Sequence, residues 1–269
     1  MIRAPLSTTS VLDEAADAVR IAAAPWAALL ILTSLPYRFA QTLFVDRLLE
    51  LGSNASRYGD YLSSMATMTM IAFVVSRWGR LVFARAVRLA IDSGASPKRE
   101  AARIPFATFL NYVYISAFAE VASLMTLMLC IGPPLFTMFS GLAIGSAEMN
   151  DHPSLAAPFR RVKQYGRNLK IVFALMFIFI CASVVAMLNV AAAFGFGLWL
   201  SGSIGGWDAH RWALLINPAN RRFLLVVIAG AVIALEPFWI AAHVTLVRKA
   251  GAEETGDDLR AWFEELRNA

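Results

Sequence analysis

Two glutamates stand alone inside long apolar runs, and they are the residues of this sequence that most suggest chemistry. Glu120 lies in the apolar run 105–131 and Glu236 in the run 223–247. Counted at about 1.5 Å per helical residue, each lies near the middle of its run, so the two are at similar depth. A carboxylate in hydrocarbon costs at least about 2.5 kcal/mol, and such side chains usually face a bundle interior or a wet cavity. This placement predicts a proton- or cation-binding pair, or a substrate anchor, in a transport path.

Neighbouring residues of the second run support that interpretation. Pro237 lacks an N–H, so it frees a backbone carbonyl beside Glu236 that can line a cavity. His243 is seven residues beyond Glu236 on the same helix face, and a histidine there can relay protons. The alternative is structural: the glutamates hydrogen-bond to other helices, and His243 is simply hydrogen-bonded near the membrane interface. The polar side chains that can serve the glutamates in this way are Asn111, Ser116, Ser123, Asn189 and Thr245.

No further motif points to an enzyme. The three histidines are scattered, and neither a Cys-x-x-Cys nor a His-x-x-x-His pair occurs, so we expect no metal site. Cys130 and Cys181 lie in apolar runs, where each is expected to be a small buried hydrophobic residue rather than part of a disulfide. Nucleophile elbows, Walker sequences and Rossmann glycine patterns are absent, so we expect neither a cofactor nor enzymatic activity. An intramembrane hydrolase is the weakest interpretation, because paired aspartates, Ser/His sets and HExxH are missing.

Composition indicates what kind of elements must position the glutamates. Of the 269 residues, 58% are hydrophobic and 16% are charged, against roughly 25% charged in an average soluble domain. These values exclude a soluble globular protein. The sequence predicts an all-α polytopic membrane bundle with about six transmembrane helices and amphipathic interfacial helices. The expected divisions are an N-terminal segment 1–20, a six-span domain 21–247 and a C-terminal tail 248–269.

Charge distribution supports the count of six spans. A span needs about 20 residues, and with their flanks six stretches qualify: 21–35, 61–76, 105–131, 134–147, 171–193 and 223–247. This topology places 18 of the 24 lysines and arginines on one side of the membrane and six on the other. By the positive-inside rule the richer side is cytoplasmic, so both termini are expected there.

One stretch leaves two interpretations open. Residues 171–207 carry no charge, and they exceed one span without containing a turn signal for two. The first interpretation is a tilted fifth span that continues into an interfacial segment, because glycines interleave there with Trp199, Trp207 and Trp212, and tryptophan favours the interface. The second is two short helices, which would break the segregation of charges between the two sides.

Three amphipathic helices are expected outside the hydrocarbon. Residues 10–20 begin with a capping-box-like pair, Ser10 and Asp13, and residues 78–92 place arginines between apolar residues as a helix on a membrane surface does. Residues 257–267 repeat apolar residues at helical spacing. These helices and a basic loop can contact a protein partner or anionic lipid headgroups, at about 1 kcal/mol per basic residue, or the charges merely set topology. The candidate contacts are Arg80, Arg85, Arg88, Arg160, Arg161, Lys163, Arg167, Trp262 and Phe263.

Segments in the second half of the chain resemble a known bacterial family. One is GLAIGSAEMND at 141–151, followed by 154–159 and the basic stretch RRVKQYGR at 160–167; the other is EPFW at 236–239, followed by GDDLR at 256–260. Both resemble the six-helix membrane proteins related to the membrane domain of glycerophosphoryl diester phosphodiesterase and to the YciC group. The resemblance implies a helical bundle in the bacterial inner membrane. It implies no active site, because the catalytic barrel that accompanies some members is absent.

These observations favour a non-enzymatic membrane component that assembles with lipid, with membrane-protein partners or with a second copy of itself. The alternative is a small transporter or permease that uses Glu120 and Glu236. The net charge of +5 is divided among separate membrane-proximal loops, so it does not indicate binding to nucleic acid.

Overall fold

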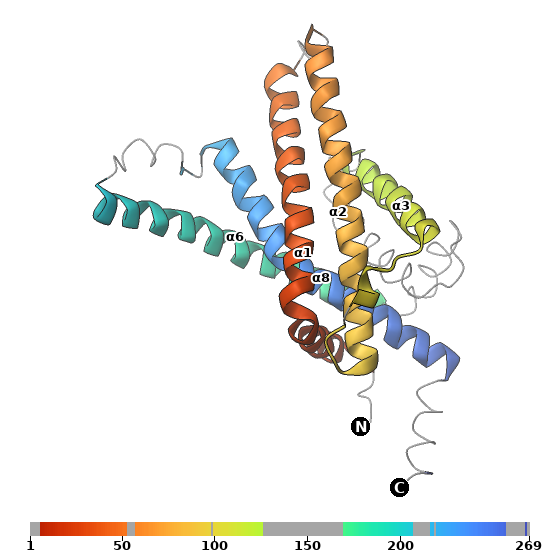
Figure 1. Cartoon of the computed structure of the whole chain (residues 1–269). Coiled ribbons are helices and arrows are strands. Elements are labelled where there is room, and N and C mark those ends of the chain that lie inside the picture. Colours follow the sequence, from red (N-terminus) through yellow and green to blue (C-terminus); the bar gives the residue numbers. More distant parts are fainter. Residues whose placement is uncertain are drawn as a thin grey trace. The chain divides into compact units, whose positions relative to one another are not determined.

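The computed structural model describes residues 6–52, 57–97, 99–125, 169–206, 216–217, 219–256 and 267. Regular structure in these ranges is entirely helical (Figure 1). The helices are α1 (Thr8–Leu51), α2 (Gly59–Ser93), the short 3-10 helix η2 (Arg99–Ala102), α3 (Phe106–Met125), α6 (Leu169–Gly205) and α8 (Arg221–Thr255). The prediction of an all-α chain is confirmed for the described part.

Long helices connect two compact units. Unit 1 comprises Met1–Leu30, Arg77–Phe177 and Pro237–Ala269, and unit 2 comprises Ile31–Ser76 and Ile178–Glu236. Helices α1, α2, α6 and α8 each contribute to both units, whereas α3 belongs to unit 1. Each unit therefore has its own buried side chains.

Three described helices are long and apolar enough to cross a membrane. They are Pro25–Leu51 within α1, Lys170–Gly205 within α6 and Arg221–Ala252 within α8. The apolar part of α3, Phe106–Val121, is shorter. By the length and composition of these helices, the chain is a membrane protein.

These helices account for some of the six expected spans. The first, fifth and sixth expected spans fall in α1, α6 and α8, and the third falls in α3. The second, 61–76, forms part of α2, where Asp60 and Arg77 confine its apolar stretch. The fourth, 134–147, lies outside the described residues.

Helix α6 resolves the two interpretations of residues 171–207. It is one continuous helix of 37 residues, so two short helices are excluded. At about 1.5 Å per residue it is about 55 Å long, which exceeds the roughly 30 Å of hydrocarbon. Part of α6 must therefore extend beyond the hydrocarbon. Cys181, expected to be buried, is exposed on this helix, because no other described helix covers that side.

The start of α1 differs from the expected one. Ser7 Oγ accepts a hydrogen bond from the Ser10 N–H, and Ser10 Oγ accepts one from the Ser7 N–H, each at 3.1 Å. This reciprocal arrangement is a capping box in which Ser10 takes the place usually held by Glu or Gln. The predicted helix 10–20 is present, but the box predicted at Ser10 and Asp13 is wrong, because Ser7 already caps the helix.

Residues 78–92 form the C-terminal part of α2, and most of the first half of this segment is buried, whereas Arg85 and Arg88 are half-buried and Asp92 is exposed. The four consecutive residues 81–84 are each 0% exposed. Successive helical residues point in different directions, so α2 is enclosed on all sides here. Arg80 is buried as well. The predicted surface position is therefore wrong for residues 79–84, because a sequence pattern does not show which elements cover a helix face.

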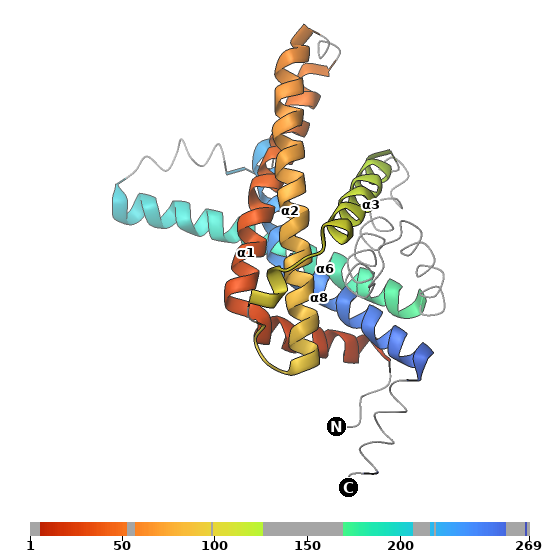
Figure 2. The same cartoon turned by 45° about the vertical axis from the view of Figure 1, so that its right-hand side comes forward.

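Helix α3, which Figure 2 shows beside α2, turns its polar residues inward and its apolar residues outward. Thr108, Tyr112 and Ser116, spaced four residues apart, are buried. The exposed side chains of this helix are Phe106, Leu110, Tyr114, Phe118 and Val121. A helix on a soluble protein shows the opposite distribution. Outward apolar residues suit hydrocarbon surroundings, where polar groups face the interior of the bundle.

Unit 2 has the same inverted distribution. Thr33, Ser34 and Asp46 of α1 are buried. The large apolar residues exposed on α1 and α2 of this unit include Leu32, Leu43, Leu49, Met68, Met70 and Ile71. Both units are therefore built for an apolar solvent.

Candidate functional site

Glu120 of α3 forms an ion pair with Arg77 of α2. Arg77 Nη2 donates to Glu120 Oε1. At about 1.5 Å per helical residue, the length of α2 from Arg77 to its end is about 24 Å. The length of α3 from its start to Glu120 is about 21 Å. Because α2 and α3 follow each other in the chain, these similar distances bring the two side chains to the same level.

The two partners differ in their access to solvent. The Arg77 side chain is 0% exposed and the Glu120 side chain 29% exposed. A guanidinium cannot lose its proton in a protein, so the buried charge of Arg77 needs compensation, to which the Glu120 carboxylate contributes. The ion pair thus joins α2 to α3 within unit 1. Other buried polar residues of this unit are Arg80, Thr108, Tyr112, Ser116, His243 and Thr245.

Glu236 and Pro237 lie where the sequence placed them, in the interior of α8. Glu236 is buried, and Pro237 follows it inside the helix. A proline at this position removes one hydrogen bond of the helix backbone. Glu236 belongs to unit 2, whereas Glu120 and its partner Arg77 belong to unit 1.

His243 is engaged within its own helix. Its Nδ1 is 2.8 Å from the Trp239 carbonyl oxygen, and because a carbonyl only accepts, Nδ1 carries the proton. The two rings also pack together, with centroids 4.1 Å apart. Asn189 likewise donates from Nδ2 to the Val185 carbonyl at 2.8 Å and is exposed, while Asn111 is half-buried.

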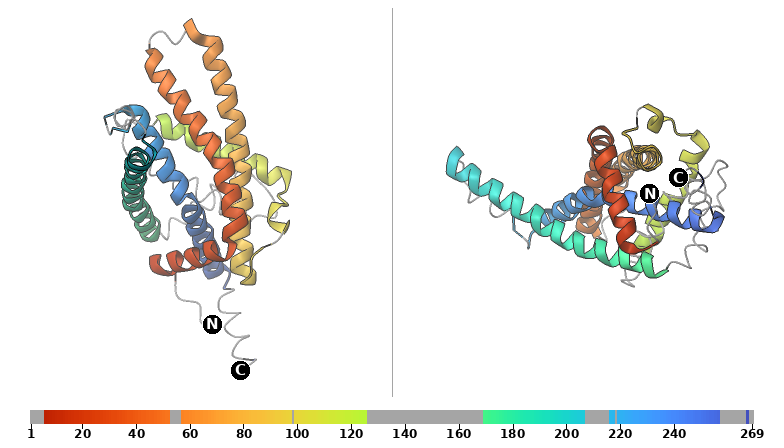
Figure 3. Two further views of the ribbon diagram at one scale, coloured as in Figure 1. Left: turned by 60° about the vertical axis from the view of Figure 1, so that its left-hand side comes forward. Right: turned by 90° about the horizontal axis from the view of Figure 1, so that it is seen from below.

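An ionic cluster joins the start of α1 to the ends of α2 and α8. Arg248 of α8 contacts Glu14 of α1 at 3.2 Å and Asp92 of α2 at 2.7 Å, and Lys249 contacts Glu14 at 2.9 Å. Figure 3 shows the first turns of α1 beside the C-terminal part of α8. These contacts hold the three helix ends together within unit 1.

A second ionic cluster lies in unit 2, where α8 begins. Asp46 of α1 is only 4% exposed, and it accepts from Arg221 at 2.5 Å and from Arg222 at 3.0 Å. Arg222 also approaches Glu50 at 3.5 Å, and Glu50 pairs with Arg47. Among the described residues, three guanidinium groups thus face two carboxylates, which gives this cluster one net positive charge.

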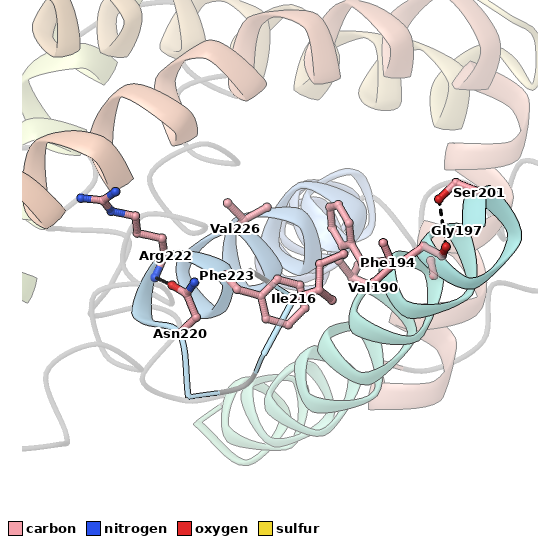
Figure 4. Close-up of a pocket in the computed structure, with 11 residues that line it drawn as sticks. Val190, Phe194, Gly197, Ser201, Ile216, Asn220, Arg222, Phe223 and Val226 are labelled. Atoms are coloured by element: carbon pink, nitrogen blue, oxygen red, sulfur yellow. Dashed lines mark hydrogen bonds between the residues drawn. The ribbon is translucent and has the colours of Figure 1, made fainter. Parts of the chain in front are cut away.

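Beside this second cluster, α6 and the start of α8 enclose a pocket of about 680 Å³ (Figure 4). The lining residues from α6 are Val190, Ala193, Phe194, Gly197, Leu198 and Ser201, and those from α8 and the residues before it are Ile216, Asn220, Arg222, Phe223 and Val226. The walls are therefore mostly apolar. Asn220 caps α8, because its Oδ1 accepts from the Arg222 N–H at 3.0 Å.

The expected lipid- or partner-contact residues are only partly described. Arg80 is buried, Arg85 donates to the Arg103 carbonyl, and Arg88 faces Asp92 at 3.7 Å. The remaining candidates lie outside the described residues: Arg160, Arg161, Lys163, Arg167, Trp262 and Phe263. Among the described residues, no group of three His, Cys, Asp or Glu side chains is placed to hold a metal ion.

Sequence reasoning missed Arg77, Asp46 and the pocket. Arg77 had a usable signal, because counting along α2 and α3 from their connection puts it level with Glu120. Asp46 had none, since its partners Arg221 and Arg222 lie 175 and 176 residues further along the chain. The pocket had none either, because it depends on how α6 and α8 pack. Comparisons of the chain with protein-family models, with curated proteins and with solved structures found no match.

Proposed function

We propose that the chain is a non-enzymatic, multi-pass component of the bacterial cytoplasmic membrane that assembles with lipid or with membrane-protein partners. It crosses the membrane six times in this proposal, and both termini lie in the cytoplasm. The resemblance to the six-helix bacterial family supports the same role.

The uncovered apolar surface of α6 carries the proposal. Val184, Val185 and Leu188 are all exposed, and so are Phe196 and Ile204 further along the helix. Residues at these spacings point in several directions around the helix axis. A large exposed apolar surface marks contact with a membrane or with a partner protein. Lipid or a partner protein can therefore bind along the exposed apolar surface of α6.

The topology is supported by the ionic cluster of Glu14, Asp92, Arg248 and Lys249. Ion pairs of this length cannot reach across a membrane, so they favour a topology in which the start of α1 and the end of α8 lie on the same side after an even number of crossings. The excess of basic residues on that side then favours the cytoplasm by the positive-inside rule.

Gentle-detergent purification from a bacterial membrane tests this function. Native mass spectrometry of the full chain should show bound lipid of a composition different from the bulk membrane, or a stoichiometric membrane-protein partner. A monomer that carries no partner, and only lipid in the bulk proportions, would contradict the proposal.

A small proton-coupled transporter is the alternative function, and the buried Glu236 favours it. A carboxylate buried in α8 and followed by Pro237 is the arrangement expected of an ion-binding position. Glu120 supports this function less, because its carboxylate already compensates Arg77. The test is the Glu236→Gln protein in flux and growth assays, with Glu50→Gln as the control for loss of an exposed carboxylate. Flux that stays at the wild-type level in Glu236→Gln would eliminate the alternative.

A further inference from the structure

Helices α6 and α8 approach closely at one point of unit 2. A Cβ added to Gly230 of α8 would lie 3.2 Å from Cγ1 of Val190 on α6, so this approach depends on glycine. Nearer the start of α8, the rings of Phe194 and Phe223 meet edge to face with centroids 5.9 Å apart. The pocket lies at this level and extends to the first turn of α8 (Figure 4).

We infer that this pocket binds one acyl chain of a glycerophospholipid and holds its phosphate at the first turn of α8. The inference rests on the proposed function and names the ligand of one face of the bundle. The walls on both helices are apolar, and a volume of about 680 Å³ lies within the roughly 300–1,000 Å³ of small-molecule sites.

The order of polar and apolar groups along the pocket matches a phospholipid. Arg222 and Asn220 lie together at the start of α8, and Phe223 and Val226 continue the wall along the helix. The candidate span begins at Arg221, so the polar groups lie at the boundary of the hydrocarbon and the apolar walls lie inside it. A phospholipid has its phosphate and its acyl chains in the same order.

Electrostatics at the polar end favour an anion. The cluster around Asp46 has one net positive charge, and the start of a helix adds partial positive charge and backbone N–H groups. The Arg222 side chain is 61% exposed, and its contacts with Asp46 and Glu50 engage Nε and Nη2. A guanidinium has five N–H donors, so Arg222 can bind a phosphate oxygen while it keeps these contacts.

The α6 wall offers no competing polar partner for the chain. Ser201 Oγ donates to the Leu198 carbonyl at 2.9 Å, so its hydroxyl proton is used within its own helix. Ala193 and Gly197 carry no polar side-chain atoms. An acyl chain therefore meets only apolar or internally satisfied groups on this side.

Two glycines of α6 provide a matched pair of variants. A Cβ at Gly197 or at Gly195 would have nothing within 4 Å, so both positions have open space where an added side chain begins. Gly197 lines the pocket, whereas Gly195 does not. Gly197→Leu should fill the pocket, and Gly195→Leu should leave it open with the same gain in helix propensity.

The experiment uses the full chain in nanodiscs of phosphatidylethanolamine and phosphatidylglycerol with a trace of phosphatidylglycerol that carries a diazirine on its acyl chain. After illumination, the label is located by mass spectrometry on the proteolytic fragments of α6 and α8. We expect labelled lipid on the pocket walls in the wild type and in Gly195→Leu, and loss of that label in Gly197→Leu. Circular dichroism of each variant checks that the helices are retained.

Arg222 and Arg221 provide the second comparison. Both contact Asp46, but only Arg222 lines the pocket. Arg222→Gln should lower pocket labelling by about tenfold, as expected for the loss of a charge-assisted hydrogen bond, and Arg221→Gln should change it much less. Equal losses in the two variants would assign the effect to the cluster with Asp46 and would contradict a phosphate contact with Arg222.

The outcomes separate this inference from the proposed function. Labelling that is unchanged in Gly197→Leu, or crosslinks from the pocket to protein instead of lipid, would overturn the inference. The proposed function survives that result if lipid or a partner still purifies with the chain in excess of the bulk membrane. It fails only if that enrichment is absent as well.

Discussion

Replacing Glu120 with glutamine should destabilise the fold more than replacing its partner Arg77. Glu120→Gln leaves a fully buried guanidinium that cannot lose its proton. Removal of one partner of a buried ion pair costs about 3–5 kcal/mol, which raises the unfolding equilibrium constant by about a hundredfold to several thousandfold. Arg77→Gln leaves a carboxylate that is 29% exposed and can reach water, so about 1–3 kcal/mol is expected.

Unfolding of the purified protein by SDS in mixed micelles, followed by far-ultraviolet circular dichroism, measures these differences. Glu50→Gln is the control, because Glu50 and Arg47 form an exposed pair worth about 0–1 kcal/mol. The double variant Arg77→Gln/Glu120→Gln should be about as stable as Arg77→Gln alone. In the Arg77→Gln protein the Glu120 carboxylate no longer pairs with Arg77, so replacing Glu120 as well should cost little further stability.

The reasoning would be refuted by the opposite order of stabilities. A Glu120→Gln protein as stable as the wild type would mean that Arg77 does not depend on this carboxylate. Additive effects in the double variant would mean that the two side chains are not coupled.

Three further predictions concern unit 2 and the topology. Asp46→Asn should lower the free energy of unfolding by about 1–3 kcal/mol. This loss is smaller than that of Glu120→Gln, because the two arginine partners of Asp46 are half-exposed and water can solvate them. The same SDS titration measures the loss. Gly230→Leu should lower the free energy of unfolding by about 1–3 kcal/mol, because the new side chain overpacks against Val190. Val190→Ala in the same protein should restore much of this stability. No recovery would mean that the substitution acts only within its own helix. The third prediction uses single cysteines, Thr9→Cys before the first span and Tyr58→Cys just before α2, in a protein without native cysteines. A membrane-impermeant maleimide should label these two cysteines from opposite sides of the membrane. Labelling of both from the same side would contradict a membrane crossing by α1.

The extent of the helices was predictable in part because local patterns determine it. The uncharged stretch from 171 to 207 predicted a long helix, but whether it formed one helix or two depended on the conformation of its glycines. The arginines of residues 78–92 predicted a surface position, and tertiary packing instead buried residues 79–84. The predicted capping box of Ser10 and Asp13 is wrong because Ser10 can pair with either of two residues, and in the structure it pairs with Ser7.

The sequence alone determined that the helices lie in hydrocarbon, because the chain has many apolar residues and few charges. It also determined the class of fold, because backbone groups in hydrocarbon have to form their hydrogen bonds within each helix. The tertiary structure decided which polar side chains meet. Arg77 and Glu120 are 43 residues apart, and Arg221 and Asp46 are 175 residues apart. Counting along α2 and α3 puts Arg77 level with Glu120, but which side chains meet depends on how the helices pack. The ion pairs and the pocket beside α8 are therefore properties of the packed helices.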